Sequence, residues 1–140
     1  MELNCMDKTE EVRQWFDIAR QDYATAEHSF TTMYPIPIEP ICFLCQQSAE
    51  KDLKGFLVMN NIIPPKTHDI TSLLTLCIGL NPAFTKIEKQ CKRLTIFGVI
   101  PRYPNELNVT LDDIKVNLKY AEEIKTFVAA LVDPLLYPML

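Results

Sequence analysis

Residues 40–69 read PICFLCQQSAEKDLKGFLVMNNIIPPKTHD, and this stretch decides the fold. Its apolar residues recur at helical spacing over an arc wide enough to pack against two neighbouring helices. Pro40 suits the first turn of such a helix, and residues 60–65, with two asparagines and two prolines, end it. The stretch therefore predicts a central helix over residues 40–60, followed by a connection that Asp69 closes as the N-cap of the next helix.

The central helix also has a polar side. Gln47, Glu50, Lys51 and Lys54 gather opposite the apolar arc. We expect these side chains to face solvent, with Glu50 and Lys54 forming an ion pair one helical turn apart.

Prolines and capping residues mark the ends of four further helices. One runs from about Glu10 to Phe30, a short one begins after Asp69 and ends at Gly79, and a fourth begins at Asn81-Pro82. Residues 95–109 show no period and predict a loop. Thr110 then caps the last helix. The result is one all-α domain over residues 1–140 with its core at about residues 9–132. The first helix buries one face, which comprises Val12, Trp15, Phe16, Ala19, Tyr23, Ala26 and Phe30.

The last helix carries two apolar stripes on roughly opposite sides. We expect the first stripe to face the core; it comprises Leu111, Ile114, Leu118, Ala121, Val128 and Val132. A small bundle rarely buries both faces of a terminal helix, and symmetric dimers are the commonest assembly. We therefore predict a homodimer through the second stripe, which comprises Val116, Tyr120, Ile124, Phe127 and Leu131.

Composition restricts the function classes. The 140 residues are 48% hydrophobic and carry a net charge of -4, so no global charge attracts nucleic acid or anionic lipid. The N-terminus lacks the order of a secretory signal, and no apolar run reaches the roughly 20 residues that span a bilayer. We expect a cytoplasmic protein, with no membrane association, whose five cysteines are reduced.

Three motifs together resemble the HEPN domain, named for higher eukaryotes and prokaryotes nucleotide-binding. They are the Gln46-Gln47-Ser48-Ala49-Glu50-Lys51 core within residues 42–57, Thr67-His68-Asp69 within residues 64–70, and Arg102-Tyr103-Pro104. The opening helix agrees, with Trp15, Ala19, Asp22 and Ala26 in the family's pattern, so the resemblance spans about residues 12–131.

The resemblance implies an up-and-down bundle of four to five helices that commonly dimerises and often accompanies a small nucleotidyltransferase. It is similar to the substrate-binding helical domains of some nucleotidyltransferases. Many members of the wider family are metal-independent ribonuclease toxins of toxin–antitoxin pairs, which carry an arginine, four to six residues and then a histidine. Here seven residues separate Arg20 from His28, and the residue that follows Arg102 after five intervening residues is Asn108 instead of a histidine. Without an imidazole at that spacing, the cleavage reaction lacks its usual proton-transfer group.

The candidate sites have alternative interpretations. His68 is either a ligand or catalytic histidine or a loop residue that fixes the turn between two helices, and Asp69 either caps the helix or orients the imidazole. Cys42 and Cys45 have the spacing of a metal or redox motif but lie on an apolar helix face, which favours core packing. A run of cations either holds a phosphate together with Arg102 and Tyr103 or is a solvated helix face; the run comprises Lys86, Lys89, Lys92 and Arg93.

The leading hypothesis is a non-catalytic helical dimer that binds a nucleotide-like ligand or a partner nucleotidyltransferase. Its expected ligand-binding residues are Lys66, His68, Arg102 and Tyr103; no catalytic residue, metal ligand or cofactor is indicated. The alternatives are a ribonuclease toxin that uses Arg102 with a non-standard acid or base, which would bind RNA, and a purely structural dimerisation module.

Overall fold

The computed structural model describes residues 8–98 and 109–138. In these ranges the chain forms five α-helices: α1 (Lys8–Thr32), α2 (Ile38–Met59), α3 (Ile70–Leu80), α4 (Glu88–Gly98) and α5 (Leu111–Ala130). A 3-10 turn, η1 (Pro82–Ile87), precedes α4. No strand occurs in these ranges, so the predicted all-α bundle is confirmed. Arg102 and Tyr103 lie outside the described residues.

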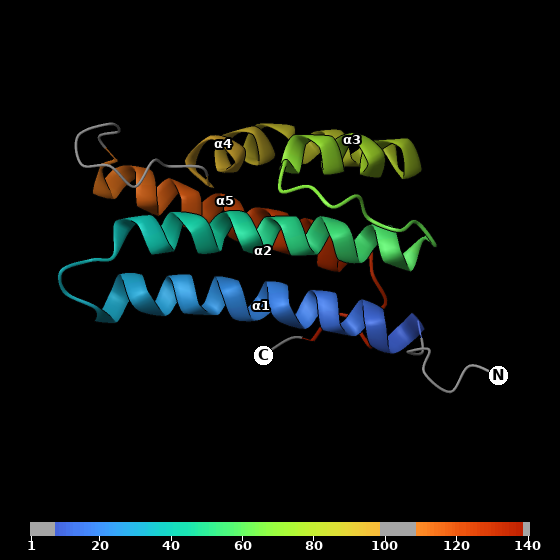
Figure 1. Cartoon of the computed structure of the whole chain (residues 1–140), viewed down its shortest axis with the longest axis horizontal. Coiled ribbons are helices and arrows are strands. Elements are labelled where there is room, and N and C mark those ends of the chain that lie inside the picture. Colours follow the sequence, from blue (N-terminus) through green and yellow to red (C-terminus); the bar gives the residue numbers. More distant parts are fainter. Residues whose placement is uncertain (1–7, 99–108, 139–140) are drawn as a thin grey trace.

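The helix α2 lies at the centre of the bundle. It runs alongside α1 on one side and contacts α3, α4 and α5 on the others. Figure 1 shows the long helices α1, α2 and α5 side by side, with α3 and α4 along one edge. The closest approach is between α1 and α2, where a Cβ added at Gly55 would lie only 2.6 Å from the Phe16 ring. Glycine at this position thus lets the two helices pack tightly.

Helix ends follow the capping residues that the sequence indicated. The Asp69 side chain accepts a hydrogen bond from the backbone of Thr71 at 3.0 Å and caps α3. Asn81 does the same for η1, and Thr110 with Asp113 forms a capping box at the start of α5. Of the two roles that the sequence left open for Asp69, capping the helix or orienting the imidazole, the structure therefore shows capping.

Two boundaries differ from the prediction. The helix α2 begins at Ile38, so Pro40 lies within its first turn, where a backbone N–H would have no intrahelical acceptor. The helix α4 continues to Gly98, although the lack of periodicity after Leu94 predicted a loop from residue 95. Phe97 is partly buried against the core there, and the Arg93 guanidinium lies 4.7 Å from the centre of its ring.

The predicted core is largely correct. The buried faces of α1, η1 and α4 match the sequence pattern, and Cys42 and Cys45 are buried as core residues. Leu111 was expected in the core but is 49% exposed, because it is the first residue of α5 and lies at the rim. The core also extends past residue 132 to Tyr137, which is 2% exposed.

The second apolar stripe of α5, which we predicted as a homodimer surface, is less exposed than the sequence pattern implied. Ile124 is fully buried within the single chain. Phe127 packs edge-on against Phe84 with ring centroids 5.0 Å apart. The helix α5 contacts α1, α2, α4 and η1, so it buries more of its circumference than the sequence pattern implied. The other four residues of the stripe remain exposed or half-buried: Val116, Tyr120, Phe127 and Leu131.

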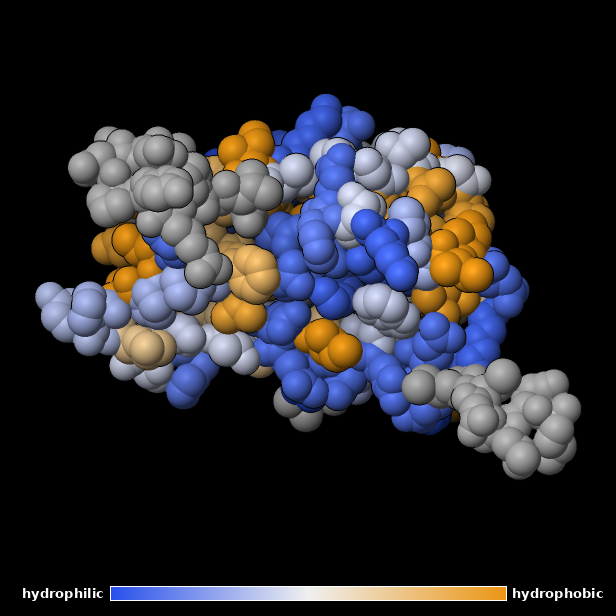
Figure 2. Space-filling view, in the orientation of Figure 1, coloured by the Kyte–Doolittle hydropathy of each residue, from blue (hydrophilic) through white to orange (hydrophobic). Residues whose placement is uncertain are grey.

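The outer surface has distinct polar and apolar regions. On the face in Figure 2, hydrophilic side chains cover the middle, and hydrophobic ones gather toward the end of α3 and the start of the α2–α3 connection. The exposed large apolar residues of those segments are Ile63, Leu76 and Leu80. Among the described helices, none is both long and apolar enough to cross a bilayer.

Candidate ligand-binding site

A buried carboxylate, Glu50 of α2, lies at the centre of the candidate site. Its side chain is 1% exposed, so its charge requires partners. Lys54 supplies the closest one, with its Nζ 2.9 Å from Oε2, and the Nζ of Lys51 lies 3.4 Å from the same oxygen. The sequence predicted the ion pair between Glu50 and Lys54 but placed it in solvent. In the structure the pair is buried: Lys54 is only 7% exposed, and its Nζ lies 5.9 Å from the centre of the Trp15 ring.

The second carboxylate oxygen holds the connection between α2 and α3. His68 Nδ1 lies 3.0 Å from Glu50 Oε1, and the Gln46 amide donates to the same oxygen at 3.3 Å. Gln46 also donates to the backbone carbonyl of His68 at 2.8 Å. These bonds dock the connection onto the middle of α2 and fix the direction of the imidazole. His68 therefore makes the contacts expected of a residue that fixes this turn. The residue that orients its ring is Glu50, not Asp69.

Electrostatics keep Glu50 ionised. Burial alone would raise the pKa of this carboxyl, but hydrogen bonds from Lys54 and His68 and the charge of Lys51 outweigh it. The net result is a pKa below the ordinary value of 4.5. With an ionised acceptor at Oε1, the proton of a neutral His68 resides on Nδ1.

His68 itself remains open to solvent. Its side chain is 81% exposed although Nδ1 is bonded to a buried carboxylate. Within the described part of the chain, Nε2 makes no hydrogen bond. Lys66, two residues earlier on the same connection, is also exposed. The connection thus presents one oriented imidazole and one ammonium to a ligand, which are groups that bind an anionic oxygen.

Two of the four predicted ligand-binding residues, Lys66 and His68, therefore share one surface. The other two, Arg102 and Tyr103, belong to residues 99–108, which lie outside the described ranges. The sequence analysis did not assign Gln46 and Glu50 to the site. Their signal was the spacing of the two on one helix face, four residues apart and opposite the apolar arc, but that pattern alone also describes a solvated helix surface.

The cationic run on α4 has a structural explanation. Arg93 donates to Asn117 at 3.0 Å and to Asp113 at 2.8 Å, both on α5. The ammonium of Lys89 lies 5.6 Å from the centre of the Tyr120 ring. Since Arg93 is already paired and the lysines lie on the outer side, these residues favour the solvated-face interpretation over a phosphate site.

The cysteine pair shows no sign of metal or redox chemistry. Cys45 is fully buried, and desolvation raises the pKa of its thiol well above the usual range. Cys42 accepts a hydrogen bond from Asn117 through its sulfur at 3.5 Å. Across residues 8–98 and 109–138, no three metal-ligating side chains come together. Core packing, which the sequence favoured, accounts for both residues.

The chain is thus an all-α bundle in which a buried glutamate with several partners holds a histidine at the surface. A family model, the HEPN domain, matches residues 12–131, and the chain belongs to that family. The chain is also similar to the crystal structure of an archaeal HEPN homologue, with 27% sequence identity and a TM-score of 0.66. That match covers 91% of this chain and 100% of the homologue. No curated protein matches the sequence.

Proposed function

We propose that this HEPN chain is a non-catalytic module that binds a phosphate-bearing, nucleotide-like ligand through Lys66 and His68. One observation carries the proposal: His68 is held at Nδ1 by a buried carboxylate while its side chain remains 81% exposed. A histidine that only fixed a turn would gain nothing from such exposure. An imidazole oriented in this way offers Nε2 to a ligand without a further cost of ordering the side chain.

The exposed cationic groups of this connection suit an anionic ligand. Lys51 and Lys54 pair with the buried Glu50, whereas Lys66 has no ion-pair partner among the described residues. Asp69 is engaged as the cap of α3. Burial, the largest effect on Asp22, raises the pKa of that carboxyl. Phosphate oxygens accept charge-assisted hydrogen bonds from ammonium and imidazolium groups. Arg102 and Tyr103 would add a second cation and a ring on which a base stacks.

The absence of catalysis in this proposal follows from the number of proton-transfer groups. General acid–base cleavage of RNA needs at least two positioned groups near the reacting phosphate. The lysines beside Glu50 are tied to that carboxylate, so His68 is the one free imidazole in this cluster of described residues. The arginine-to-histidine spacing of the ribonuclease members is missing from the sequence as well.

A titration with related ligands tests the proposal. ADP and AMP should raise the melting temperature and shift amide resonances near residue 68, whereas adenosine, which lacks the phosphate, should bind more weakly. His68→Gln and Lys66→Met should each weaken ADP binding by about tenfold. His28→Gln is the matched control, because His28 is also exposed but lies on α1.

Three outcomes would overturn the proposal. They are equal affinity for adenosine and ADP, unchanged binding in His68→Gln, and no stabilisation by any nucleotide or short RNA. Cleavage of RNA that Arg102→Ala abolishes would establish the ribonuclease alternative instead. Capture of a nucleotidyltransferase with no nucleotide binding would favour the partner-binding form of the module.

The proposed module is a homodimer whose contact surface centres on Val116, Tyr120 and Leu131. These residues belong to the part of the second stripe of α5 that its own chain leaves at least partly exposed, and Phe127, which is half-buried against Phe84, lies beside them on the stripe. Light scattering after size-exclusion chromatography should give the mass of two chains. Leu131→Asp should shift the mass to one chain, and Leu135→Asp, at an exposed leucine just beyond α5, should leave it unchanged. A concentration-independent monomer would exclude the dimer.

A further inference from the structure

A pocket of about 270 Å³ lies between α1, α5 and the segment that follows α5. Arg20, Tyr23 and Ala24 of α1 line it together with Lys125 of α5 and Tyr137 near the C-terminus. None of these residues belongs to the Glu50 cluster. The nucleotide proposal therefore leaves this pocket unexplained.

The C-terminal segment forms one wall and is firmly attached. The Tyr137 ring stacks on Phe16 with centroids 4.7 Å apart, and its hydroxyl donates to the buried Asp52 at 2.6 Å. Arg13 donates to the backbone carbonyl of Leu135 at 2.9 Å. Because Tyr137 is held at both its ring and its hydroxyl, the wall exists before any ligand binds.

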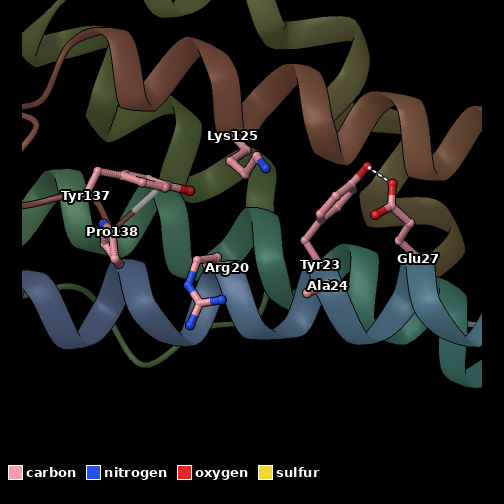
Figure 3. A pocket seen from close by; sticks show the side chains of 7 residues that line it. All are labelled: Arg20, Tyr23, Ala24, Glu27, Lys125, Tyr137 and Pro138. Carbon is pink, nitrogen blue, oxygen red and sulfur yellow. Dashed lines mark hydrogen bonds between the residues drawn. The ribbon is translucent and has the colours of Figure 1, made fainter. Parts of the chain in front are cut away.

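Figure 3 shows how the side chains are arranged around the pocket. The Tyr137 and Tyr23 rings lie on either side of an open space, and Lys125 reaches toward that space from α5. The Lys125 ammonium lies 4.8 Å from the centre of the Tyr23 ring. Among the described residues, no carboxylate lies within ion-pair distance of Lys125. The pocket thus contains a cation whose partners are aromatic faces.

Two buried polar atoms near the pocket lack partners. Only three buried side-chain nitrogen or oxygen atoms of the described residues make no hydrogen bond, and two of them are Arg20 Nε and Asp52 Oδ2. Arg20 lines the pocket, and Asp52 lies behind Tyr137, which also lines it. Buried polar groups are nearly always paired, so each of these two atoms leaves a hydrogen bond that the described residues do not supply.

The charges are separated along the pocket. Glu27 lies at one end, where it is exposed to solvent and accepts a hydrogen bond from the Tyr23 hydroxyl at 3.3 Å. Figure 3 places Lys125 and the Tyr137 hydroxyl toward the other end. An anionic group would therefore be repelled at the Glu27 end and attracted at the Lys125 end.

We infer that this pocket binds a small aromatic carboxylate, with its carboxylate on Lys125 and its ring between Tyr23 and Tyr137. The volume lies just below the roughly 300–1,000 Å³ usual for ligand sites, which suits a small molecule of one ring. The walls include two tyrosine rings, Ala24 and Pro138, which suit ring binding. Of the two cations that line the pocket, Arg20 already pairs with Asp17, so Lys125 fixes the orientation. This site is separate from the one proposed for phosphate-bearing ligands.

Three probes with the same ring and different charge test the inference: benzoate, benzamide and benzylamine. Binding followed by amide and side-chain NMR shifts of the full chain should rank benzoate first, benzamide second and benzylamine last. Lys125→Met should weaken benzoate binding by about tenfold and leave benzamide nearly unchanged. Lys119→Met, at an exposed lysine on the same helix, is the matched control.

A second variant tests the location independently of Lys125. Ala24→Leu should fill the pocket and abolish binding of both benzoate and benzamide, whereas Thr25→Leu, at the next and equally exposed residue of α1, should not. The inference is overturned if benzamide or benzylamine binds as tightly as benzoate. It is also overturned if benzoate binds Ala24→Leu as well as the native chain, or if millimolar benzoate shifts no resonance near Tyr23 and Tyr137.

Discussion

Glu50 and Asp52 are two buried carboxylates on one helix, two residues apart, and they experience opposite environments. Glu50 is 1% exposed and has two lysines, a histidine and an amide around it. Asp52 is fully buried and has one hydrogen-bond partner, the Tyr137 hydroxyl, while its second oxygen has none among the described residues. Residues two apart on a helix lie roughly 200° apart around its axis, so the two carboxylates contact different parts of the bundle.

The consequence appears in their ionisation. Burial would raise the pKa of both, yet the partners of Glu50 bring its pKa below 4.5, while burial, only partly offset by Tyr137 and Lys125, raises the pKa of Asp52 to about 7. The number of charged partners, and not burial, therefore decides the direction of the shift. Glu50 provides a permanent charge that orients His68, and Asp52 is a group that changes charge near neutral pH beside the pocket.

The largest expected effect follows from breaking the Glu50 cluster. Glu50→Ala leaves Lys54 as a buried cation without its closest partner and releases the 64–69 connection. We expect the free energy of unfolding to fall by about 3–5 kcal/mol, the usual cost of removing one member of a buried ion pair. Urea denaturation measures it.

Glu39→Ala is the matched control for that variant. Glu39 lies in the first turn of the same helix but is exposed, so its loss should cost less than about 1 kcal/mol. If the two variants lose the same stability, the cluster has no special role in the fold.

The sequence predicted the helices well and this cluster only in part. Proline and capping positions such as Asp69, Asn81 and Thr110 are local signals, and they located the helix starts. The Glu50–Lys54 pair was also local. The burial of this pair could not be predicted from local sequence. It depends on Trp15 of α1 and on the docked 64–69 connection, which only the assembled bundle brings to the polar side of α2.

The pocket between α1 and α5 was beyond prediction for a related reason. Its lining residues come from two parts of the sequence about a hundred residues apart, with Arg20 in one and Lys125 and Tyr137 in the other, and they share no periodic pattern. The same holds for Ile124, which the helical stripe assigned to an exposed face although α5 buries it against the core. Periodicity shows which residues share a helix face, but the number of neighbours that cover that face is a property of the tertiary structure.

The second prediction concerns the pH dependence of Asp52. Its pKa is higher in the folded chain, at about 7, than the ordinary 3.8, so the folded state binds the proton more tightly. Its contribution to stability is complete below about pH 4 and is lost as pH rises through 7, by up to about 4 kcal/mol. Glu50 acts in the opposite direction, because its lowered pKa gives stability that is lost only as pH falls below 4.5.

Asp52→Asn isolates that contribution, since asparagine has the same shape and never ionises. We expect the variant to be about as stable as the native chain at pH 5 and more stable at pH 8, by up to about 3 kcal/mol, since about two of the three pH units of the shift lie above pH 5. Urea denaturation at pH 5, 6.5 and 8 provides the comparison. A difference between the two proteins that does not grow with pH would contradict the raised pKa of Asp52.

The smallest expected effect comes from the one partner that Asp52 has. Tyr137→Phe removes the hydroxyl but keeps the ring stacked on Phe16, so both oxygens of Asp52 become unpaired. We expect a loss of about 1–3 kcal/mol, larger at pH 8, where the carboxylate is ionised, than at pH 5. Tyr120→Phe should change stability by less than about 0.5 kcal/mol, since no described residue bonds its hydroxyl. Equal losses at both pH values would mean that Asp52 keeps one charge state from pH 5 to pH 8, as Glu50 does, and would contradict its raised pKa.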